Sequence, residues 1–483
     1  MKIYIKGHTF GYELQRVAQM FFPGEKVEVS QGEPDEETLA GDYLVTCAEN
    51  SRLTVSGSIG ESRSCRCEEP ILQTDAPSDL EHKLGVMIYR VASQATGIYP
   101  QWGVLTGIRP VKLFLSRMEQ GMDEAELRTH FLNGCLVNER KFDLALKTAR
   151  IEREILAKST SDSFSLYISI PFCPTRCAYC SFVSHSIEQA AKLIPAYVGK
   201  LCEELADTAR IAAQLKLKLR TVYFGGGTPT TLSAQQLERI MGTIAAQFDF
   251  SGIWEYTVEA GRPDTITADK LREIKEAGAG RISINPQTLS DSVLEVIGRK
   301  HTTRQLMDVF AMARDYGFDN INMDLIAGLP TDTPEGFKAS IDGVIAMAPE
   351  NITVHTLTVK RASRITFEQA CAELQTVGGM VDYAQEAVTA AGYAPYYLYR
   401  QNGSLSSLEN VGYAKPGTEG LYNIYIMDET HSILGVGAGA STKLRHPVTG
   451  AFERIYNYKY PYEYMQHFEA AKERKQRILE FYR

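Results

Sequence analysis

The sequence predicts an α/β fold built around an open, partial barrel of six strand-and-helix units. From residue 166 onward, short apolar strands alternate with longer helical stretches, a pattern typical of a parallel sheet with helices outside it. Six units are fewer than the eight of a closed barrel, which favours an open one. A doubly wound sheet fits the same alternation. The length of 483 residues exceeds one ordinary core and indicates two or three domains.

Three parts follow from this pattern: an N-terminal α+β domain over 1–160, the partial barrel over 161–365 and a C-terminal covering region over 366–483. The N-terminal strands are expected at 3–6, 26–29, 43–47 and 53–56, with helices at 12–22, 78–96, 110–120, 123–133 and 138–158. The barrel strands are expected at 166–170, 221–224, 256–259, 281–284, 320–326 and 353–359. The helix after the first barrel strand is expected to end near residue 214. The helices between the later strands are expected at 234–247, 268–277, 303–316 and 334–346. Beyond residue 366 we expect a helix, strand-like Tyr/Gly-rich sequence and a charged terminal helix.

Composition excludes several classes of function. The net charge of −8 offers no basic field for nucleic acid. No stretch approaches the roughly 18 apolar residues of a membrane span, and the first residues lack the features of a signal peptide. We therefore expect a cytoplasmic protein without nucleic-acid or membrane partners.

Three of the nine cysteines form one tight group, Cys173-Pro-Thr-Arg-Cys177-Ala-Tyr-Cys180, directly after the first barrel strand. In a reducing compartment such a group indicates metal or redox chemistry rather than disulfides. Three thiolates can hold a four-iron cluster and leave one iron open to a cofactor. The alternative is a tetrahedral zinc site with His185 as the fourth ligand.

Further polar and glycine signals follow the next strands. The turn Gly225-Gly-Gly-Thr228-Pro follows the second strand and can bring backbone amides close to a ligand. Glu259 ends the third strand, Gln287 follows the fourth, and Asp324 lies in the fifth. Because parallel strands end at one edge of their sheet, these groups are expected to converge on a ligand.

The cysteine spacing resembles that of radical S-adenosylmethionine (SAM) enzymes. The segments 167–180, 225–229, 281–287 and 322–330 further resemble the oxygen-independent coproporphyrinogen III dehydrogenase family. The motifs Trp102-Gly-Val-Leu-Thr-Gly-Ile-Arg-Pro110 and Tyr413-Ala-Lys-Pro-Gly-Thr-Glu-Gly-Leu-Tyr-Asn423 are similar to its HemZ branch. The resemblance covers nearly the whole chain.

The resemblance implies a 4Fe–4S cluster on the three cysteines and one or two molecules of SAM. The first SAM would meet Tyr167, Gly226 and Glu259, and Tyr179 is a further candidate cofactor contact. A second SAM would be held by a set of five residues: Gly227, Thr228, Gln287, Arg299 and Asp324.

The implied reaction converts two propionate side chains of coproporphyrinogen III to vinyl groups, giving protoporphyrinogen IX and carbon dioxide in haem biosynthesis. A flavodoxin- or ferredoxin-like reductase would supply electrons. No catalytic side chain is assigned, because the cofactors supply the reactive chemistry. Four cations are candidate partners for the substrate carboxylates: Arg109, Lys360, Arg361 and Arg364.

One departure leaves alternatives open. The dehydrogenases place a fourth cysteine two positions after the third, where this chain has Phe182. A haem-trafficking protein with the same fold shares the phenylalanine, but its His-Asn-x-x-Tyr-Trp signature has no match here. A third possibility is a radical enzyme acting on another tetrapyrrole. Fold cannot separate the three.

Overall fold

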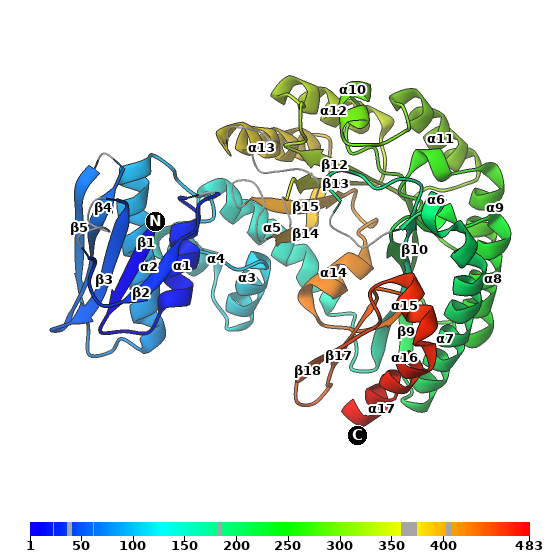
Figure 1. The fold of residues 1–483 in the computed structure, drawn as a ribbon, viewed down its shortest axis with the longest axis horizontal. Helices are drawn as coiled ribbons and strands as arrows, with labels where there is room; N and C mark the ends of the chain where they lie inside the picture. The colour runs from blue at the N-terminus through cyan, green and yellow to red at the C-terminus, as the bar shows by residue number, and fades with distance from the viewer. Residues whose placement is uncertain (23, 36–40, 61, 181–184, 359–373, 402–407) are drawn as a thin grey trace. The chain divides into compact units, whose positions relative to one another are not determined.

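The computed structural model describes residues 1–483 except 23, 36–40, 61, 181–184, 359–373 and 402–407 (Figure 1). The chain forms two compact units, Met1–Leu146 with Arg400–Leu408, and Lys147–Tyr399 with Glu409–Arg483. The boundary falls inside the helix α5 (Glu139–Leu156). The division of the sequence into three parts stays a prediction.

The first unit contains a five-stranded sheet in the order β2-β1-β3-β4-β5. Its strands are β1 (Lys2–Lys6), β2 (Glu28–Gln31), β3 (Tyr43–Glu49), β4 (Arg52–Ile59) and β5 (Ser62–Pro70). The strand β5 is not foreseen from the sequence. The helices α1 (Gly11–Gln19) and α2 (Pro77–Thr96) pack on the sheet and bury an apolar core that includes Ile3, Leu44 and Ile88. The chain continues through α3 (Pro110–Glu119), α4 (Glu124–Arg128) and the π-helical turn η2 (Thr129–Gly134).

The motif that begins at Trp102 belongs to the packing of this unit. The Trp102 side chain is buried, and the Arg400 guanidinium lies 5.8 Å from the centroid of its ring. The Arg400 amide also donates to the Ile108 carbonyl at 2.7 Å. Pro110 opens α3, as the sequence predicts, because its fixed φ suits the first helical turn.

The second unit is organised by one eleven-stranded sheet in the order β14-β15-β13-β12-β11-β10-β9-β6-β16-β17-β18. Six neighbouring strands of this sheet run parallel and form the predicted partial barrel: β6 (Ser163–Ile170), β9 (Lys218–Gly226), β10 (Glu255–Glu259), β11 (Arg281–Ser283), β12 (Ile321–Ala327) and β13 (Asn351–Thr356). They are buried on both sides, which explains why they read as nearly continuous apolar runs. The predicted α/β fold is confirmed.

Helices cover the outer face of these strands, where Figure 1 shows them as one arc. They are α7 (Ile194–Gln214), α8 (Ala234–Gln247), α9 (Ala268–Glu276), α10 (Asp291–Val296), α11 (Thr303–Asp315) and α12 (Pro334–Met347). Four of them begin at a hydroxyl side chain that caps a backbone amide of the first turn: Ser233, Thr267, Thr302 and Thr333. These caps fix where each strand-to-helix turn ends.

The C-terminal part both covers and extends the sheet. The helix α14 (Leu421–Asp428) packs against β9. The strand β15 (Glu409–Ala414) lies antiparallel to β13, with β14 (Ala394–Arg400) beyond it. At the other edge β16 (Ser432–Val436) lies parallel to β6, followed by β17 (Ser441–Arg445) and β18 (Phe452–Tyr456). The sequence does not reveal these two extensions, because strand neighbours distant along the chain leave no periodic signal.

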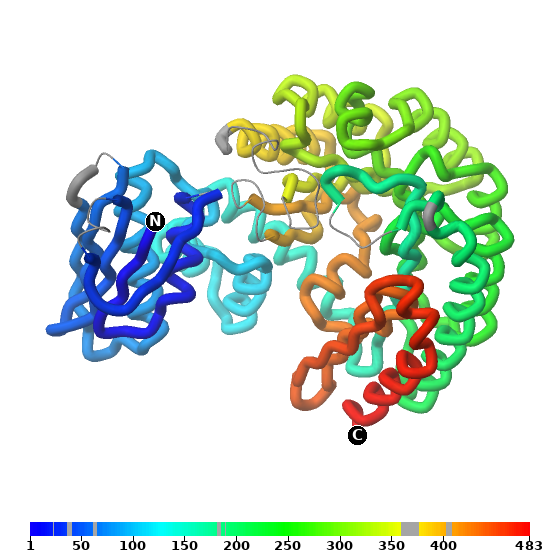
Figure 2. The backbone as a smooth tube through the Cα atoms, in the orientation of Figure 1, coloured from blue at the N-terminus to red at the C-terminus, as the bar shows by residue number. Residues whose placement is uncertain are grey.

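The remaining helices of the second unit are α6 (Ile187–Ala190), α13 (Leu374–Ala390), α15 (Pro461–Gln466), α16 (Phe468–Lys475) and α17 (Arg477–Phe481), with 3-10 turns at Ala191–Leu193, Pro229–Thr231 and Pro263–Thr265. The red C-terminal segment in Figure 2 runs beside α7. Among the described residues, no helix is both long and apolar enough to cross a lipid bilayer.

Candidate cofactor site at the carboxyl ends of the strands

The three clustered cysteines lie in a loop that follows β6. Cys173 belongs to the short strand β7 (Phe172–Cys173), which pairs with β8 (His185–Ser186). Cys177 is buried, and Cys173 and Cys180 are half-buried. The loop is tied down from outside, since the Ala178 amide donates to the Ile297 carbonyl at 2.9 Å and the Thr175 hydroxyl donates to the Gly298 carbonyl at 3.0 Å.

Arg262, in the loop that follows β10, also holds the cysteine loop in place, although the sequence alone does not point to it. Its guanidinium donates to both carboxylate oxygens of Asp264 at 2.9 Å, to the Thr175 hydroxyl at 3.2 Å and to the Cys177 sulfur at 3.5 Å. Only 3% of the side chain is exposed. The one feature of the sequence that could have pointed to Arg262 is its position three residues after Glu259, in the loop that follows β10. An arginine that is buried in such a loop needs a hydrogen-bonding partner.

Tyr179 and Arg299 form a second buried contact in this loop. The Arg299 guanidinium donates to the Tyr179 hydroxyl at 3.1 Å and to the Asn285 carbonyl at 2.6 Å. Burial alone would lower the pKa of Arg299, but the neighbouring Tyr179 and Cys177 raise it above its ordinary value. Arg299 is therefore a buried cation beside the cysteines, a role that its sequence position alone does not show.

The glycine turn after β9 packs directly on Cys173. The Gly227 amide donates to the Ile170 carbonyl at 2.7 Å, and the Thr228 hydroxyl lies 3.5 Å from the Cys173 sulfur. A Cβ added at Gly227 would approach the Phe172 carbonyl oxygen to 2.5 Å and the Cys173 sulfur to 3.0 Å. Gly226 has a φ of +107° that side-chain-bearing residues rarely adopt. The turn therefore needs glycine for a close approach to the backbone of residues 170–172, whereas the ligand contact expected from the sequence stays a prediction.

Tyr167 and Glu259 face one another around Gly225. A Cβ at Gly225 would lie 3.2 Å from both the Glu259 Oε1 atom and the Tyr167 ring. The Tyr223 hydroxyl donates to Glu259 Oε1 at 2.6 Å. Tyr422 of α14 stacks on Tyr223, with ring centroids 4.3 Å apart, and on Tyr167 at 6.1 Å. The predicted pair thus lies in an aromatic wall whose other members, Tyr223 and Tyr422, are not predicted.

Gln287, in the loop after β11, forms an isolated parallel bridge with β12, the strand that carries Asp324. The Gln287 amide donates to the Asp324 carbonyl at 2.9 Å, and the Ile326 amide donates to the Gln287 carbonyl at 3.0 Å. Gln287 is buried at a φ of +70°, a conformation that costs a non-glycine residue about 1–3 kcal/mol and is often found at functional sites. Among the described contacts, none joins Arg299 to Gln287 or Asp324.

The Asp324 carboxylate has its own set of partners. Asn322 donates to its Oδ1 atom at 2.8 Å, and the His355 Nε2 atom lies 3.8 Å from its Oδ2 atom. Burial would raise the pKa of Asp324, but His355, Asn322 and Thr353 together lower it. His355 is a further residue at this edge that sequence reasoning does not select.

The surroundings of Glu259 and Asp324 shift the pKa values of the two carboxyl groups in opposite directions. Burial raises the pKa of Glu259 to about 7; Asp324 adds to this, whereas the Tyr223 hydrogen bond and His355 oppose it. Asp324 stays ionised while Glu259 exchanges its proton near neutral pH. Such a divergence between neighbouring acids is typical of functional sites.

The cysteine loop offers a set of donor atoms that suits an iron–sulfur cluster. Among the residues that the structure describes, no three His, Cys, Asp or Glu side chains converge tightly enough to hold one metal ion. A cubane binds each thiolate to a different iron, so it needs no such convergence. The His185 ring instead packs edge-on against Tyr460 and Tyr462, with centroids 5.9 and 6.1 Å away. Three soft thiolates with an adjoining glycine turn therefore suit an iron–sulfur cluster.

Several sequence predictions are not tested by these contacts. Phe182, Lys360, Arg361 and Arg364 lie outside the described residues. Arg109 is half-buried at the start of α3 in the first unit.

Comparison with known proteins identifies the family. Residues 167–343 match the model of the radical SAM superfamily. The chain is also 35% identical to the oxygen-independent coproporphyrinogen-III oxidase-like protein HemZ of Bacillus subtilis, over 97% of this chain and 95% of that protein. The chain belongs to the radical SAM superfamily, in its HemZ branch. The resemblance in the sequence motifs is thereby confirmed.

This radical SAM protein has further relatives. It is 34% identical to the haem chaperone HemW of Bacillus subtilis, over 57% of this chain and 70% of that protein. The solved structure of coproporphyrinogen III oxidase (HemN) from Escherichia coli superposes with a TM-score of 0.53 at 22% identity, over 67% of this chain and 73% of that one. At that identity the likeness shows the fold alone. Membership of the superfamily implies a 4Fe–4S cluster and SAM as cofactors and supports an enzyme.

Proposed function

We propose that this protein is an oxygen-independent coproporphyrinogen III dehydrogenase, which converts two propionate groups of its substrate to vinyl groups with loss of two molecules of carbon dioxide. The observation that carries the proposal is the similarity to HemZ along 97% of the chain, whereas the HemW relative matches 57%. The grouping of the cysteine loop, the glycine turn, Glu259 and Asp324 at neighbouring strand ends supports it.

The three cysteines would hold the cluster through three of its irons. When bound, the reduced cluster and SAM would supply a 5′-deoxyadenosyl radical able to take a hydrogen atom from the β-carbon of a propionate. Carbon dioxide would leave as an electron acceptor takes the remaining electron of the substrate radical. Ionised Glu259 would accept hydrogen bonds from the SAM bound at the cluster. Tyr167 and Gly226, with the aromatic wall behind them, would orient that SAM and exclude water.

A second SAM would be held by Gly227, Thr228, Gln287, Arg299 and Asp324. The backbone hydrogen bond from the Gln287 amide to the Asp324 carbonyl, which brings the loop after β11 onto β12, supports this part of the proposal. Arg299, in contrast, is occupied by Tyr179 and Asn285. Equilibrium dialysis of the reconstituted protein with labelled SAM would distinguish one bound molecule from two.

The alternative is haem trafficking, favoured by the HemW relatives and by Phe182, which stands where the dehydrogenases place a fourth cysteine. The two functions differ in product. A chaperone binds haem and releases no carbon dioxide, whereas a dehydrogenase changes the mass of its tetrapyrrole.

The deciding experiment is anaerobic reconstitution with iron and sulfide, followed by reduction with SAM and coproporphyrinogen III present. We expect 5′-deoxyadenosine together with a porphyrin product that has lost two carboxyl groups, both measured by mass spectrometry. The Cys177→Ala variant serves as the matched control without a cluster. Deoxyadenosine without decarboxylation would indicate another substrate, and stable haem binding without either product would indicate trafficking.

A further inference from the structure

A chain of aromatic contacts connects the cysteine loop to an exposed surface. In the paired strands β7 and β8, Phe172 lies opposite His185 and Cys173 lies opposite Ser186. His185 therefore sits one strand away from the start of the cysteine group. Its Nε2 atom is buried and has no hydrogen-bond partner among the residues that the structure describes.

The His185 ring packs edge-on against two stacked tyrosines. Its centroid lies 5.9 Å from that of Tyr460 and 6.1 Å from that of Tyr462, and the two tyrosine rings are 5.6 Å apart with an interplanar angle of 10°. Tyr462 is 48% exposed. The exposed Tyr462 and the half-buried Tyr460 thus contact, through their rings, the residue that adjoins the cysteine strand.

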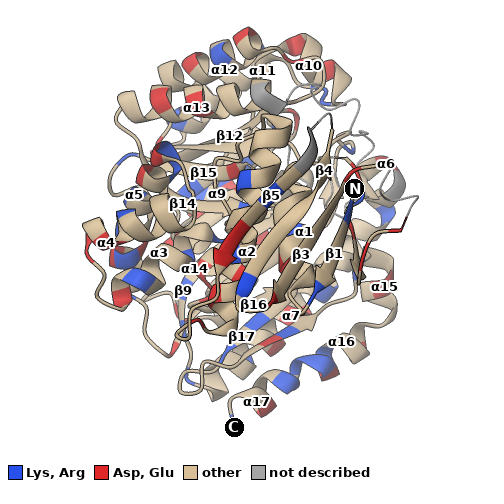
Figure 3. Ribbon diagram, turned by 90° about the vertical axis from the view of Figure 1, so that its left-hand side faces the viewer, with Lys and Arg blue, Asp and Glu red and all other residues tan. Residues whose placement is uncertain are grey.

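A positively charged side chain lies at the exposed end of this series of aromatic contacts. Lys459 is exposed, and its ammonium lies 5.8 Å from the centroid of the Tyr460 ring. Residues 432–483 contain nine Lys and Arg against five Glu; of these cations, Lys475 is buried in an ion pair with Glu204 and Lys472 pairs with Asp207. Figure 3 shows basic residues along α16. In the same segment the Arg474 guanidinium packs over the Tyr458 ring. The acidic residue nearest to Tyr460 in the sequence is Glu463.

We propose that Lys459, Tyr460 and Tyr462, here named the Tyr460 patch, form the docking surface for an acidic one-electron carrier protein that reduces the cluster. This inference rests on the radical chemistry of the proposed function. One electron leaves a reduced flavin or iron–sulfur centre of the carrier, which is oxidised, and the cluster on the cysteines gains it. No covalent bond forms or breaks.

Three properties of the patch match such a partner. Electron-transfer complexes are small and transient, so a few exposed side chains suffice. Tyrosines are enriched at protein interfaces, and a cation such as Lys459 speeds the encounter with a partner of opposite charge. The carrier must also approach the cluster closely, and the contacts through His185 give this patch a short route to Cys173.

The first test measures binding of oxidised flavodoxin to the full chain by isothermal titration calorimetry at low salt. We expect Lys459→Glu to weaken binding at least about tenfold, because it replaces a steering cation with a like charge. Lys338→Glu is the matched control: Lys338 is exposed and also lies over a tyrosine ring, that of Tyr383 at 5.2 Å, but on α12. Equal affinities of Lys459→Glu and wild type, or an equal loss in Lys338→Glu, would overturn the proposal.

The second test measures reduction of the reconstituted cluster by stopped-flow absorbance, with reduced flavodoxin or with dithionite. We expect Lys459→Glu and Tyr462→Leu to slow reduction by flavodoxin about tenfold and to leave reduction by dithionite unchanged, since that small anion needs no docking surface. A variant that is slow with both reductants would have a damaged cluster rather than a lost docking surface, which overturns the assignment for that residue.

The two proposals can fail separately. If dithionite-reduced protein decarboxylates coproporphyrinogen III but Lys459→Glu accepts electrons from flavodoxin as fast as wild type, only the docking surface is wrong. If the protein forms a cluster that flavodoxin reduces through the patch but no porphyrin product appears, the proposed substrate is wrong and the docking surface stands.

Discussion

Two buried carboxylates of the second unit, Glu204 and Glu259, have opposite surroundings. Glu204 on α7 is 1% exposed and meets Lys475 at 2.8 Å, the Tyr464 hydroxyl at 2.6 Å and the Gly437 amide at 2.7 Å. Asn457 donates to it as well, at 2.8 Å. Glu259 at the carboxyl end of β10 has the Tyr223 hydroxyl as its hydrogen-bond donor among the described contacts.

The difference separates structure from function. The Glu204 network joins the C-terminal segment to α7 and leaves the carboxylate no capacity for a ligand. Glu259 is desolvated without full compensation, and its raised pKa records that cost. A fold retains such a group where a ligand will complete its hydrogen bonds.

The largest expected effect is at the cysteine loop. Cys177→Ala removes one of three cluster ligands and should abolish the cluster, because the remaining two thiolates cannot hold a cubane with one open iron. The measurement is the iron and sulfide content after anaerobic reconstitution. Cys202→Ala is the control, since Cys202 lies on α7 away from the loop and should keep the full content. A normally coloured Cys177→Ala protein would contradict the assignment.

The next largest effect is expected on stability, at the buried hydrogen-bond network around Glu204. Lys475→Met leaves Glu204 buried without its cation and should destabilise the protein by about 3–5 kcal/mol, whereas Glu204→Gln with Lys475→Met should recover most of this. Both side chains of the pair are at most 2% exposed. Arg304→Met, at an ion pair whose arginine is 84% exposed, should change stability by less than about 1 kcal/mol. Chemical denaturation measures all three, and equal losses at the two sites would refute the contrast.

A smaller effect is expected at the brace of the loop. Arg262→Lys keeps the positive charge but cannot hold Asp264 with two bonds and reach Thr175 at once. We expect the reconstituted variant to lose iron to a chelator about tenfold faster than wild type, since hydrogen bonds to charged groups contribute about 1.5–3 kcal/mol. The same change at the half-exposed Arg272 of α9 should leave the rate unaltered. If the two variants behave alike, Arg262 does not stabilise the loop.

The smallest expected effect is a gain in stability, on replacement of Glu259 by glutamine. The folded-state pKa of Glu259 is about 7 against an ordinary 4.5, so the stability from this carboxyl is fully present below 4.5 and is lost as pH rises through about 7. Glu259→Gln does not titrate and can still accept from Tyr223. It should therefore be more stable than wild type above pH 7, by about 1–2 kcal/mol, and the gain should shrink as pH falls.

The measurement is the thermal midpoint of both proteins at a series of pH values. The same variant should bind SAM more weakly, because the ionised acceptor is gone. A variant that is less stable than wild type above pH 7 would show that Glu259 is held by contacts as complete as those of Glu204.

Much of the fold is readable from local pattern. The ends of α8 and α12 follow from their caps and apolar spacing, and the six barrel strands follow from their apolar runs. The cysteine loop and the glycine turn were found because short-range spacing alone defines them. Arg262 and His355 were missed because their significance arises from partners distant along the chain.

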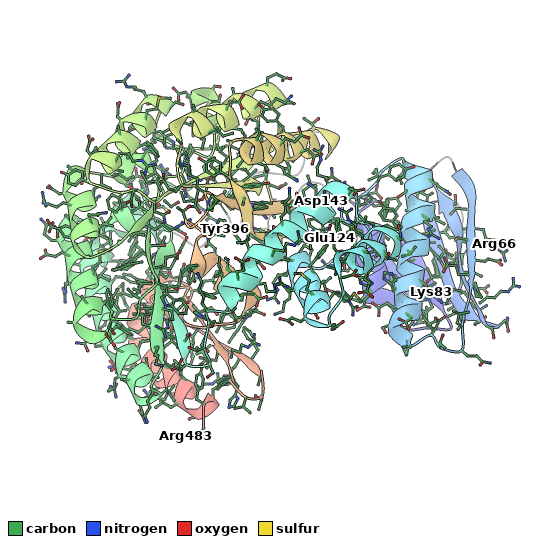
Figure 4. The ribbon with its side chains drawn as sticks, turned by 180° about the vertical axis from the view of Figure 1, so that it is seen from behind. Arg66, Lys83, Glu124, Asp143, Tyr396 and Arg483 are labelled. Carbon is green, nitrogen blue, oxygen red and sulfur yellow. The ribbon has the colours of Figure 1, made fainter. Side chains whose placement is uncertain are left out.

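Tyr396 illustrates the same limit. In Figure 4 it is labelled within the second unit, fully buried, where Arg281 of β11 and Asn423 of α14 contact its hydroxyl. Nothing in the local sequence Ala394–Arg400 predicts that contact.

Local sequence pattern identifies the residues that can carry the chemistry: three thiols at cluster spacing, a run of glycines after the second barrel strand, and polar groups in or just after the following strands. Spacing and strand periodicity are local properties, so they survive without coordinates. The tertiary contacts account for what the sequence does not show: Glu259 is desolvated and Asp324 is paired, arginines brace the cysteine loop, and C-terminal strands extend both edges of the sheet. These features depend on which distant segments meet, and burial and electrostatics are set by that meeting.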